Sequence, residues 1–490
     1  MKLHFRDLFK DLFIYGTGDI FLKAAAFLTL PFYTRIFTLE EYGIWSFVVT
    51  AVGLLNSILI LGGDSAYARF FFEAKSQEEK RLITSTWFGF LALWSGSLTI
   101  FCLPFTGLFS LCSFGTKAYA LLFTLTLLAA PVALINTMCG QALRNRFQAR
   151  TFVIINVAST LLSIGLSLFG AIVLKLGLTG VLGGAFFAAL AMLPFRIWTV
   201  RGLLCPTFSL QILRKLLKFG VPLIPSSLGY WIFAVSDRIL LGKLSNLEQV
   251  GLYTVANQVT GILAFFNGAL GQAWSPHAIR VYEEQRQSAP IFFGRVLTYI
   301  LCGFGLLCVF FTAFSKEFLI FLSTPSFYPA GAAFGPLALG FVAYASTQVT
   351  AMGISLAKKT QYFAICSWLA ALLNLGLNVL LIPKWGMMAA CWTTLAAYLF
   401  LTVAYLTVSQ RLWPVVYEKR RLFVAGGLTL IFTFAVPLLP VLSLTFSIII
   451  KSLYCSVFVG LLFLLKGLDG REWEALLTFM RGRLVAARVT

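Results

Sequence analysis

Residues 35–45 read RIFTLEEYGIW, and residues 243–253 read KLSNLEQVGLY. A basic residue, a Leu-Glu pair, a glycine and an aromatic residue keep their places in both stretches, at an offset of 208 residues. A second similar pair is offset by 209 residues, with KLGLTGVLGGAFFAAL at 175–190 and KWGMMAACWTTLAAYL at 384–399. Two nearly equal offsets predict a duplicated lobe of roughly 200 residues, which is a common architecture of secondary transporters.

The composition of the 490-residue chain is that of a membrane protein. Apolar residues make up 59% of the chain and charged residues 11%, whereas a soluble domain carries about 25% charged residues. Because many apolar runs exceed the roughly 18 residues that span a bilayer, we predict an all-α polytopic membrane protein with about fourteen transmembrane helices. The predicted spans lie near residues 12–34, 43–62, 83–109, 118–140, 152–174, 178–195, 219–241, 250–273, 290–313, 331–351, 362–383, 386–408, 422–442 and 444–465.

The net charge of +20 follows the predicted topology, which argues against a nucleic-acid partner. Of the 38 Lys and Arg residues, we assign 29 to the N-terminus, the even-numbered loops and the C-terminus, six to the odd-numbered loops and three to span interiors. By the positive-inside rule, both termini of this multi-pass protein are predicted to be cytoplasmic. Anionic membrane lipids are the expected partners of the basic loops.

The repeat predicts two parallel six-helix lobes plus two additional C-terminal helices. The predicted N-lobe covers residues 1–200, the C-lobe 201–410, the added spans 411–466 and a cytoplasmic tail 467–490. Because each lobe contains an even number of spans, both lobes enter the membrane in the same orientation. A basic loop at 196–218 joins the lobes.

Motifs of common enzyme chemistry are missing from the sequence. It contains no GxxxxGK[ST] phosphate loop, no HExxH zinc motif and no CxxC pair. Glu40 in the first outer loop recurs as Glu248, which favours a helix start over a catalytic acid. We therefore expect no catalytic residue, no metal and no cofactor.

Charged residues inside the apolar spans are the strongest candidates for a functional site. Each costs about 2.5–3.5 kcal/mol at the centre of a membrane helix. Asp19 and Lys23 are four residues apart and can pair on one helix face, either as a structural ion pair or as part of a cavity. Asp237 and Arg238 point about 100° apart, so a cavity-lining role is favoured for them. Lys451 in the last span is a weaker candidate because it can snorkel.

Glycine and proline interrupt the first span of each lobe, and these spans carry the same charged pairs. The first contains Gly16, Gly18 and Pro31, and the seventh contains glycine and proline between 220 and 229. Interrupted helices at matching places in two halves are a good sequence indication of a transport site. The two observations together predict a substrate site near these helices.

Three blocks of the sequence resemble a known family of transporters. They are PFYTRIFTLEEYGIWSF at 31–47, LGG at 61–63 with YARF at 67–70, and SDRILLGKLSNLEQVGLYTVANQV at 236–259. These blocks resemble the Wzx-like polysaccharide flippases of the multidrug/oligosaccharidyl-lipid/polysaccharide exporter superfamily, and the resemblance runs from about residue 10 to 410.

The resemblance implies a function and a set of substrate-binding residues. It implies flipping of undecaprenyl-diphosphate-linked oligosaccharide, such as an O-antigen unit of lipopolysaccharide, across a bacterial inner membrane by alternating access. Arg238 and Asp237 match the family's pair in span 7, and Arg35 matches its Thr-Arg after span 1, while Asp19 and Lys23 are carried over as further candidates. A polysaccharide polymerase is an expected partner.

The physical chemistry of the cargo agrees with this implication. Guanidinium groups bind phosphate bidentately, so a cavity rich in Lys and Arg attracts a diphosphate headgroup. Without a nucleotide site, the energy comes from a gradient, the membrane potential or consumption of the product. Asp19 or Asp237 can couple transport to a proton or a sodium ion.

Alternative functions remain open at this point. A drug/cation antiporter of the same superfamily favours an acidic cavity, whereas the spans here hold two acids and three bases. A lipid II flippase also has fourteen spans. A membrane glycosyltransferase or polymerase usually has a large outer loop, which this chain lacks, and a scaffold does not explain charges inside interrupted helices.

Overall fold

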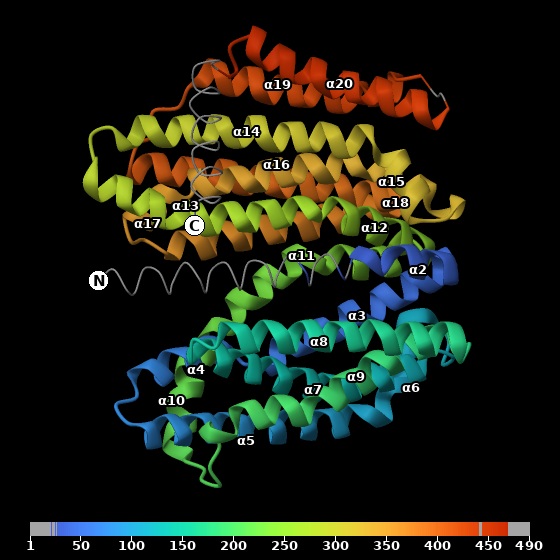
Figure 1. Cartoon of the computed structure of the whole chain (residues 1–490), viewed down its shortest axis with the longest axis vertical. Helices are drawn as coiled ribbons and strands as arrows, with labels where there is room; N and C mark the ends of the chain where they lie inside the picture. The colour runs from blue at the N-terminus through green and yellow to red at the C-terminus, as the bar shows by residue number, and fades with distance from the viewer. Residues whose placement is uncertain (1–20, 22–24, 26, 441–442, 469–490) are drawn as a thin grey trace, which may run out of the picture. The chain divides into compact units, whose positions relative to one another are not determined.

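The computed structural model describes residues 21, 25, 27–440 and 443–468, and every regular element in this part of the chain is a helix (Figure 1). Ten helical segments among the described residues are long and apolar enough to cross a membrane. The predicted all-α membrane fold is therefore confirmed. Asp19 and Lys23, with most of the first predicted span, lie outside the described residues.

The described chain forms two compact units that differ from the lobes predicted from the repeat. Unit 1 extends to Thr254 and also contains Leu322–Ser326, and unit 2 contains the rest of the chain. The boundary lies beyond residue 200 because α11 (Ile224–Leu244) packs on α3 (Leu39–Leu59). The repeat-based boundaries at 200, 410 and 466 stay a prediction.

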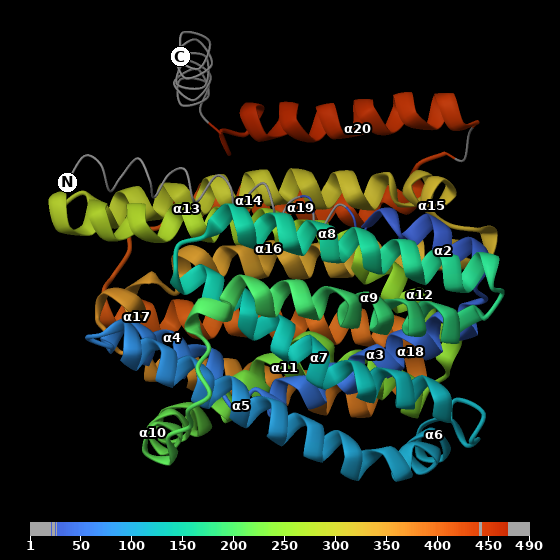
Figure 2. The same ribbon diagram turned by 60° about the horizontal axis from the view of Figure 1, so that its bottom comes forward.

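Unit 1 contains both short helices and helices that are long enough to cross a membrane (Figures 1 and 2). Besides α3 and α11, they are α2 (Leu30–Ile36), α4 (Gly63–Glu73), α5 (Gln77–Cys102), α6 (Thr106–Phe114), α7 (Ala120–Asn145), α8 (Ala149–Leu168), α9 (Gly177–Val200), α10 (Leu210–Gly220) and the start of α12 (Leu247–Thr260). α9 packs on both α7 and α8, and α10 packs on α4 and α5.

Unit 2 is built around α16, which packs on both α14 and α18. Its helices are α13 (Ile262–Glu284), α14 (Ala289–Ala313), α15 (Ser315–Leu322, whose last residue belongs to unit 1), α16 (Phe334–Thr350), α17 (Met352–Leu356), α18 (Gln361–Leu412), α19 (Lys419–Ala435) and α20 (Leu444–Leu464). α14 also packs on α19 and α20.

Two elements differ from the predicted spans in an informative way. α18 contains the two spans predicted near 362–383 and 386–408, and they are joined without a loop at Gly386 (φ 54°, ψ −133°). Only glycine adopts this backbone conformation readily. The span predicted near 250–273 is divided at Gly261 between α12 and α13.

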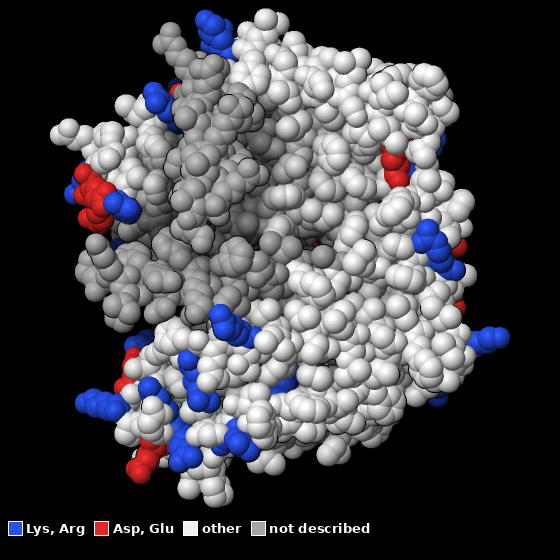
Figure 3. Space-filling view, viewed as in Figure 1, with Lys and Arg blue, Asp and Glu red and all other residues white. Residues whose placement is uncertain are grey.

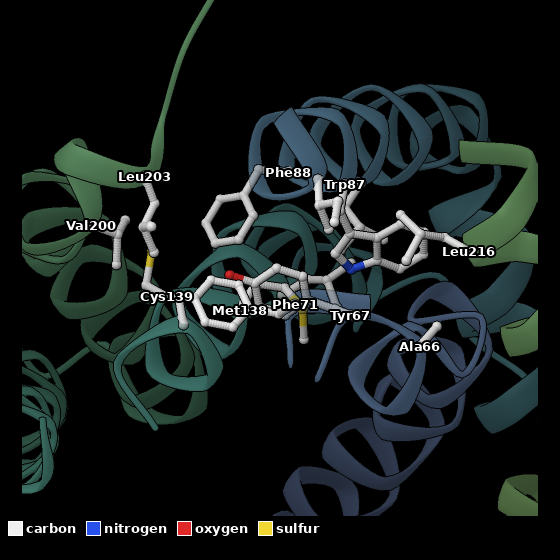
Figure 4. Close-up of a cluster of buried hydrophobic side chains, with 14 of the residues drawn as sticks. Ala66, Tyr67, Phe71, Trp87, Phe88, Met138, Cys139, Val200, Leu203 and Leu216 are labelled. Carbon is white, nitrogen blue, oxygen red and sulfur yellow. The ribbon is translucent and has the colours of Figure 1, made fainter. Parts of the chain in front are cut away.

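The core of unit 1 contains a cluster of large buried side chains from α4, α5, α7 and α10 (Figure 4). Trp87 on α5 is fully buried in it, between Tyr67 on α4 and Leu216 on α10. A Cβ atom at Gly63 would lie 1.6 Å from the Trp87 ring. Lipid is as apolar as these side chains, so close packing rather than transfer from water holds the helices together. Gly63 is therefore required for the contact between α4 and α5.

We predict that Gly63→Ala destabilises the protein by about 1–3 kcal/mol, because the methyl group displaces a rigid buried indole. Gly96→Ala in α5 is the matched control, since nothing lies within 4 Å of a Cβ there. That control is expected to be neutral or to stabilise the helix by up to about 1 kcal/mol. Unfolding in detergent measures both, and equal stability of the two variants would contradict the packing argument.

Candidate functional site

The repeated segments meet each other in unit 1, where the start of α3 crosses the start of α12. A Cβ atom at Gly43 would lie 1.9 Å from the Leu247 carbonyl oxygen, and one at Gly251 would lie 2.4 Å from the Leu39 carbonyl oxygen. These contacts are reciprocal, because Leu247 and Gly251 are the counterparts of Leu39 and Gly43 at the offset of 208. Reciprocal contact between equivalent surfaces is the property of a two-fold interface.

A hydrogen bond at the same offset extends the crossing by one helical turn. The buried hydroxyl groups of Ser46 and Thr254 are 2.7 Å apart and 208 positions apart in the sequence. Glycine at two positions and small hydroxyl residues at two more allow the backbones to approach closely, as in other membrane helix pairs. The repeat therefore builds a specific helix–helix contact.

The outer-loop acids are helix starts, as the repeat indicated. The Glu41 carboxylate accepts a hydrogen bond from the Thr38 backbone at 2.9 Å, and the Thr38 hydroxyl accepts one from Glu41, which forms a capping box at the start of α3. Glu40 and Glu248 each lie in the first turn of their helix, and Asn246 caps the backbone of Gln249.

Asp237 of the predicted site is buried beside this crossing. Its carboxylate is 1% exposed and accepts a hydrogen bond of 2.6 Å from the hydroxyl of Tyr253, a buried residue of α12. A short O–H···O⁻ bond stabilises the charged form of a carboxylate. The bond also ties α11 to α12 next to Gly251 and Thr254.

Arg238, the next residue of α11, has unused hydrogen-bonding capacity. It is half-buried, and its Nε atom is buried with no hydrogen-bond partner among the described residues. A buried guanidinium donor without an acceptor is costly, so this group is suited to bind an anionic oxygen that enters from outside the protein.

Of the remaining predicted site residues, Arg35 lies in unit 1 and Lys451 in unit 2. Arg35 is exposed at the end of α2 and donates a hydrogen bond of 2.7 Å from Nη1 to the Pro31 carbonyl oxygen. Lys451 on α20 is buried and donates to both carboxylate oxygens of Glu317 at 2.7 Å. Its ammonium charge is therefore paired in this structure, and its role in binding substrate stays a prediction.

Two further polar groups are buried, and one of them was misplaced by the sequence prediction. Arg196, predicted to lie in the loop 196–218, is instead buried within α9, which continues to Val200. Asn378 joins Asn374 and Thr393 in a fully buried network across the two halves of α18. Asparagine within an apolar span is typical of a hydrogen bond between helices, whereas nothing at Arg196 marked the helix end. No group of three His, Cys, Asp or Glu in the described ranges is arranged to hold a metal ion.

The two ends of unit 1 differ in charge. Lys and Arg side chains gather over α4, α5 and α10 at the lower left of Figure 3. The exposed cations there include Arg69, Lys75, Arg81, Arg214, Lys215 and Lys218. The loops at the other end of the helices expose isolated cations, including Lys117 and Lys175. This distribution follows the alternation predicted from the sequence.

We predict that Gly43→Ala and Gly251→Ala each open the crossing of α3 and α12, because either methyl group would overlap a carbonyl oxygen. Thr50, one turn beyond Ser46 and 7% exposed, is a suitable reporter position. In a background without reactive cysteines, labelling of Thr50→Cys by a membrane-impermeant thiol reagent should increase several-fold. Gly96→Ala is the control. Unchanged labelling in both Gly43→Ala and Gly251→Ala would show that these glycines do not keep the two helices in close contact.

The Lys451–Glu317 ion pair predicts how the stability of the protein depends on pH. Burial alone would raise the pKa of the Glu317 carboxyl on α15, but hydrogen bonds from Lys451 and Ser447 outweigh it and hold the pKa below its ordinary value. A carboxyl whose pKa is lowered by folding stabilises the protein above its unfolded pKa, about 4.3, and this contribution is lost as pH falls through the folded pKa.

Glu317→Gln should therefore lower thermal stability at pH 7, and its deficit relative to wild type should shrink below about pH 4. Because removal of one partner leaves a buried charge, Lys451→Met should cost about 3–5 kcal/mol at most, and the double variant should be more stable than Lys451→Met alone. Additive losses in this double-mutant cycle would show that the two groups do not interact.

Comparison with known proteins agrees with this architecture. The family described as "Polysaccharide biosynthesis protein" matches residues 8–282. The succinoglycan biosynthesis transport protein ExoT of Rhizobium meliloti is 24% identical over 298 residues, which cover 59% of this chain and 58% of that protein. The chain spans between 39% and 67% of the length of the curated relatives it matches.

Solved structures with the same fold are transporters and flippases. The lipid II flippase MurJ, in an inward closed conformation, has a TM-score of 0.75 and 14% identity, and the match covers 91% of this chain and 98% of that one. An inward-facing multidrug resistance MATE family transporter of the MOP superfamily has a TM-score of 0.58 and 17% identity, covering 79% and 94%. With its family match over more than half of its length, the chain belongs to the polysaccharide biosynthesis protein family, as a Wzx-like member with the fold of the MOP superfamily.

Proposed function

We propose that the protein flips undecaprenyl-diphosphate-linked oligosaccharide from the cytoplasmic to the outer leaflet of a bacterial inner membrane by alternating access around a cationic cavity. The observation that carries the proposal is the buried Nε donor of Arg238, which has no hydrogen-bond partner among the described residues and lies beside a helix crossing built from the repeat. Membership of a polysaccharide biosynthesis family and likeness to a succinoglycan transport protein support a lipid-linked sugar as the cargo.

The crossing of α3 and α12 provides a physical basis for one closed end. It lies at the ends of helices next to the cation-poor loops, which the positive-inside rule places outside the cell. We infer that the crossing closes the outer side and that cargo enters from the cytoplasmic side. Opening would separate Gly43 from Leu247 and Gly251 from Leu39 while the bond between Asp237 and Tyr253 keeps α11 and α12 together.

Arg238 would bind the diphosphate, because its donors can form charge-assisted hydrogen bonds with phosphate oxygens. Asp237 is already bonded to Tyr253, so its proposed role is to orient α11 or to take up a coupling proton or sodium ion. Arg35 and the undescribed Asp19 and Lys23 remain proposed parts of the cavity. We propose that both termini are cytoplasmic and that a polysaccharide polymerase receives the product.

We predict that Arg238→Gln abolishes flipping while the protein still inserts and folds, because an amide cannot replace the charge or the bidentate donors. Arg238→Lys should retain a small fraction of the rate. The assay uses proteoliposomes with a fluorescent polyprenyl-diphosphate oligosaccharide and an external quencher. Arg214→Gln, an exposed cation of α10, is the matched control and should flip normally.

The same proteoliposomes distinguish the alternatives. Flipping of lipid II in preference to the oligosaccharide would identify a lipid II flippase. Uptake of an organic cation under a proton or sodium gradient, without lipid flipping, would identify a drug antiporter. Normal flipping by Arg238→Gln would refute the proposed role of Arg238.

A further inference from the structure

Arg196 is a charged residue buried among three helices of unit 1. It lies on α9 and is 7% exposed. Its Nη2 atom donates hydrogen bonds of 2.8 Å to Asn156 Oδ1 and to Ser159 Oγ, both on α8, and its Nη1 atom donates one of 3.3 Å to the Asn136 carbonyl oxygen of α7. All three acceptors are uncharged, so its positive charge has no opposite charge in these contacts.

The guanidinium also has more donors than these acceptors can use. Arginine has five N–H groups, and the three hydrogen bonds leave Nε buried with no partner among the described residues. The side-chain oxygen of Asn136 beside it is likewise buried and unpaired in this part of the chain. A buried charge without a counter-charge costs several kcal/mol even when neutral groups solvate part of it.

The sequence around Arg196 offers no carboxylate to pay this cost. From residue 80 to residue 236 the chain contains twelve Lys and Arg residues and no Asp or Glu. The positive-inside rule accounts for the cations, but it does not require the absence of acids, because Asp and Glu contribute little to topology. None of the contacts of Arg196 described above is with a carboxylate, so an anion from outside the described part of the chain can supply its counter-charge.

The position of Arg196 indicates the kind of anion that can reach it. Its neighbours on α9, Phe195 and Trp198, are 64% and 61% exposed, as expected of side chains that face lipid. Arg201, near the end of the same helix, lies 4.9 Å from the Trp198 ring. Aromatic and basic residues of this kind mark the membrane interface, and Arg196 lies roughly 7 Å deeper along the helix.

The two hydrogen-bond acceptors on α8, Asn156 and Ser159, are accessible from outside the protein. Nearly all of α8 is partly or fully exposed, and Asn156 and Ser159 themselves are partly exposed. Two partly exposed, uncharged side chains of α8 therefore contact the buried cation directly. Phosphate is the anion of the lipid headgroups at the interface nearest to Arg196, and guanidinium is the side chain that binds phosphate best.

We propose that the guanidinium of Arg196, held by Asn156 and Ser159 at the cytoplasmic boundary of unit 1, is a phosphate-binding site, which takes the headgroup phosphate of an anionic membrane lipid or of a polyprenyl diphosphate. The site is separate from Arg238 and does not depend on the proposed flipping activity. It adds a second place in unit 1 where a phosphate-bearing lipid can be held.

The test is thermal unfolding of the purified full-length protein in a neutral detergent. The probes are phosphatidylglycerol, undecaprenyl diphosphate and inorganic diphosphate, with diacylglycerol of the same chains as the uncharged control. Phosphatidylglycerol or undecaprenyl diphosphate should raise Tm by several degrees, and Arg196→Met should remove most of that shift. Arg201→Met, an exposed cation near the end of the same helix, should keep it.

The lipid probes and inorganic diphosphate distinguish the two sources of phosphate. A shift with the lipids alone assigns a headgroup, and an equal shift with inorganic diphosphate assigns a free anion at the same residues. The proposal is overturned if the lipid-dependent shift in Tm of Arg196→Met equals that of the wild-type protein. The proposal is also overturned if Arg196→Met no longer changes the lipid-dependent shift in Tm once Asp19 is replaced by Asn. In that case Asp19, within the protein, would be the counter-charge of Arg196.

A second variant covers the case in which Arg196→Met does not fold. Asn156→Ala keeps the charge and frees one Nη2 donor, so the lipid-dependent shift in Tm should grow. A shift identical to that of wild type would overturn the proposal. Arg196→Lys, which keeps the charge but loses the planar donors, should retain part of the shift.

Discussion

A charged side chain inside an apolar helix bundle must have its charge and its hydrogen bonds satisfied, and this constraint organises the polar structure of the protein. Burial of a single ion without a partner costs several kcal/mol. Lys451 satisfies both requirements with the carboxylate of Glu317, and Asp237 accepts a hydrogen bond from the hydroxyl of Tyr253. Arg196 and Arg238 satisfy them only in part, since each keeps a buried Nε without a described partner. An anionic ligand would therefore gain the most binding free energy by accepting a hydrogen bond from one of these two Nε groups.

A second constraint is the close approach of α3 and α12, which the internal repeat makes possible. Two helices that carry the same short pattern can meet in reciprocal contact only if their backbones approach closely, which explains glycine at both 43 and 251. The Ser46–Thr254 hydrogen bond fixes the register of that contact. Because Asp237 is bonded to Tyr253, two residues after Gly251, the charged residues of α11 are coupled to the same crossing. A change in the crossing therefore changes the surroundings of Arg238.

The sequence predicted the helices well because length and hydropathy are local properties. The span predicted near 290–313 is α14 from Ala289 to Ala313, and the pair near 362–383 and 386–408 meets at Gly386. The partner of Lys451 could not be predicted, because Glu317 is 134 positions away and lies outside any span. Arg196 was misplaced for a different reason. The apolar run ends near residue 195, but the helix continues to Val200, since hydrogen bonding rather than hydropathy ends a helix.

The absence of carboxylates between residues 80 and 236 connects these observations. An acid placed near Arg196 would pair with it and remove the stabilisation that a phosphate ligand gains. In unit 2 the opposite arrangement holds, because Glu317 pairs with Lys451 and the charge is cancelled within the protein. Internal pairing favours a fixed structure, whereas an unpaired cation favours an exchangeable anion. The distribution of acids along the chain thus separates the part that is suited to hold phosphate from the part in which a buried cation is neutralised by the protein itself.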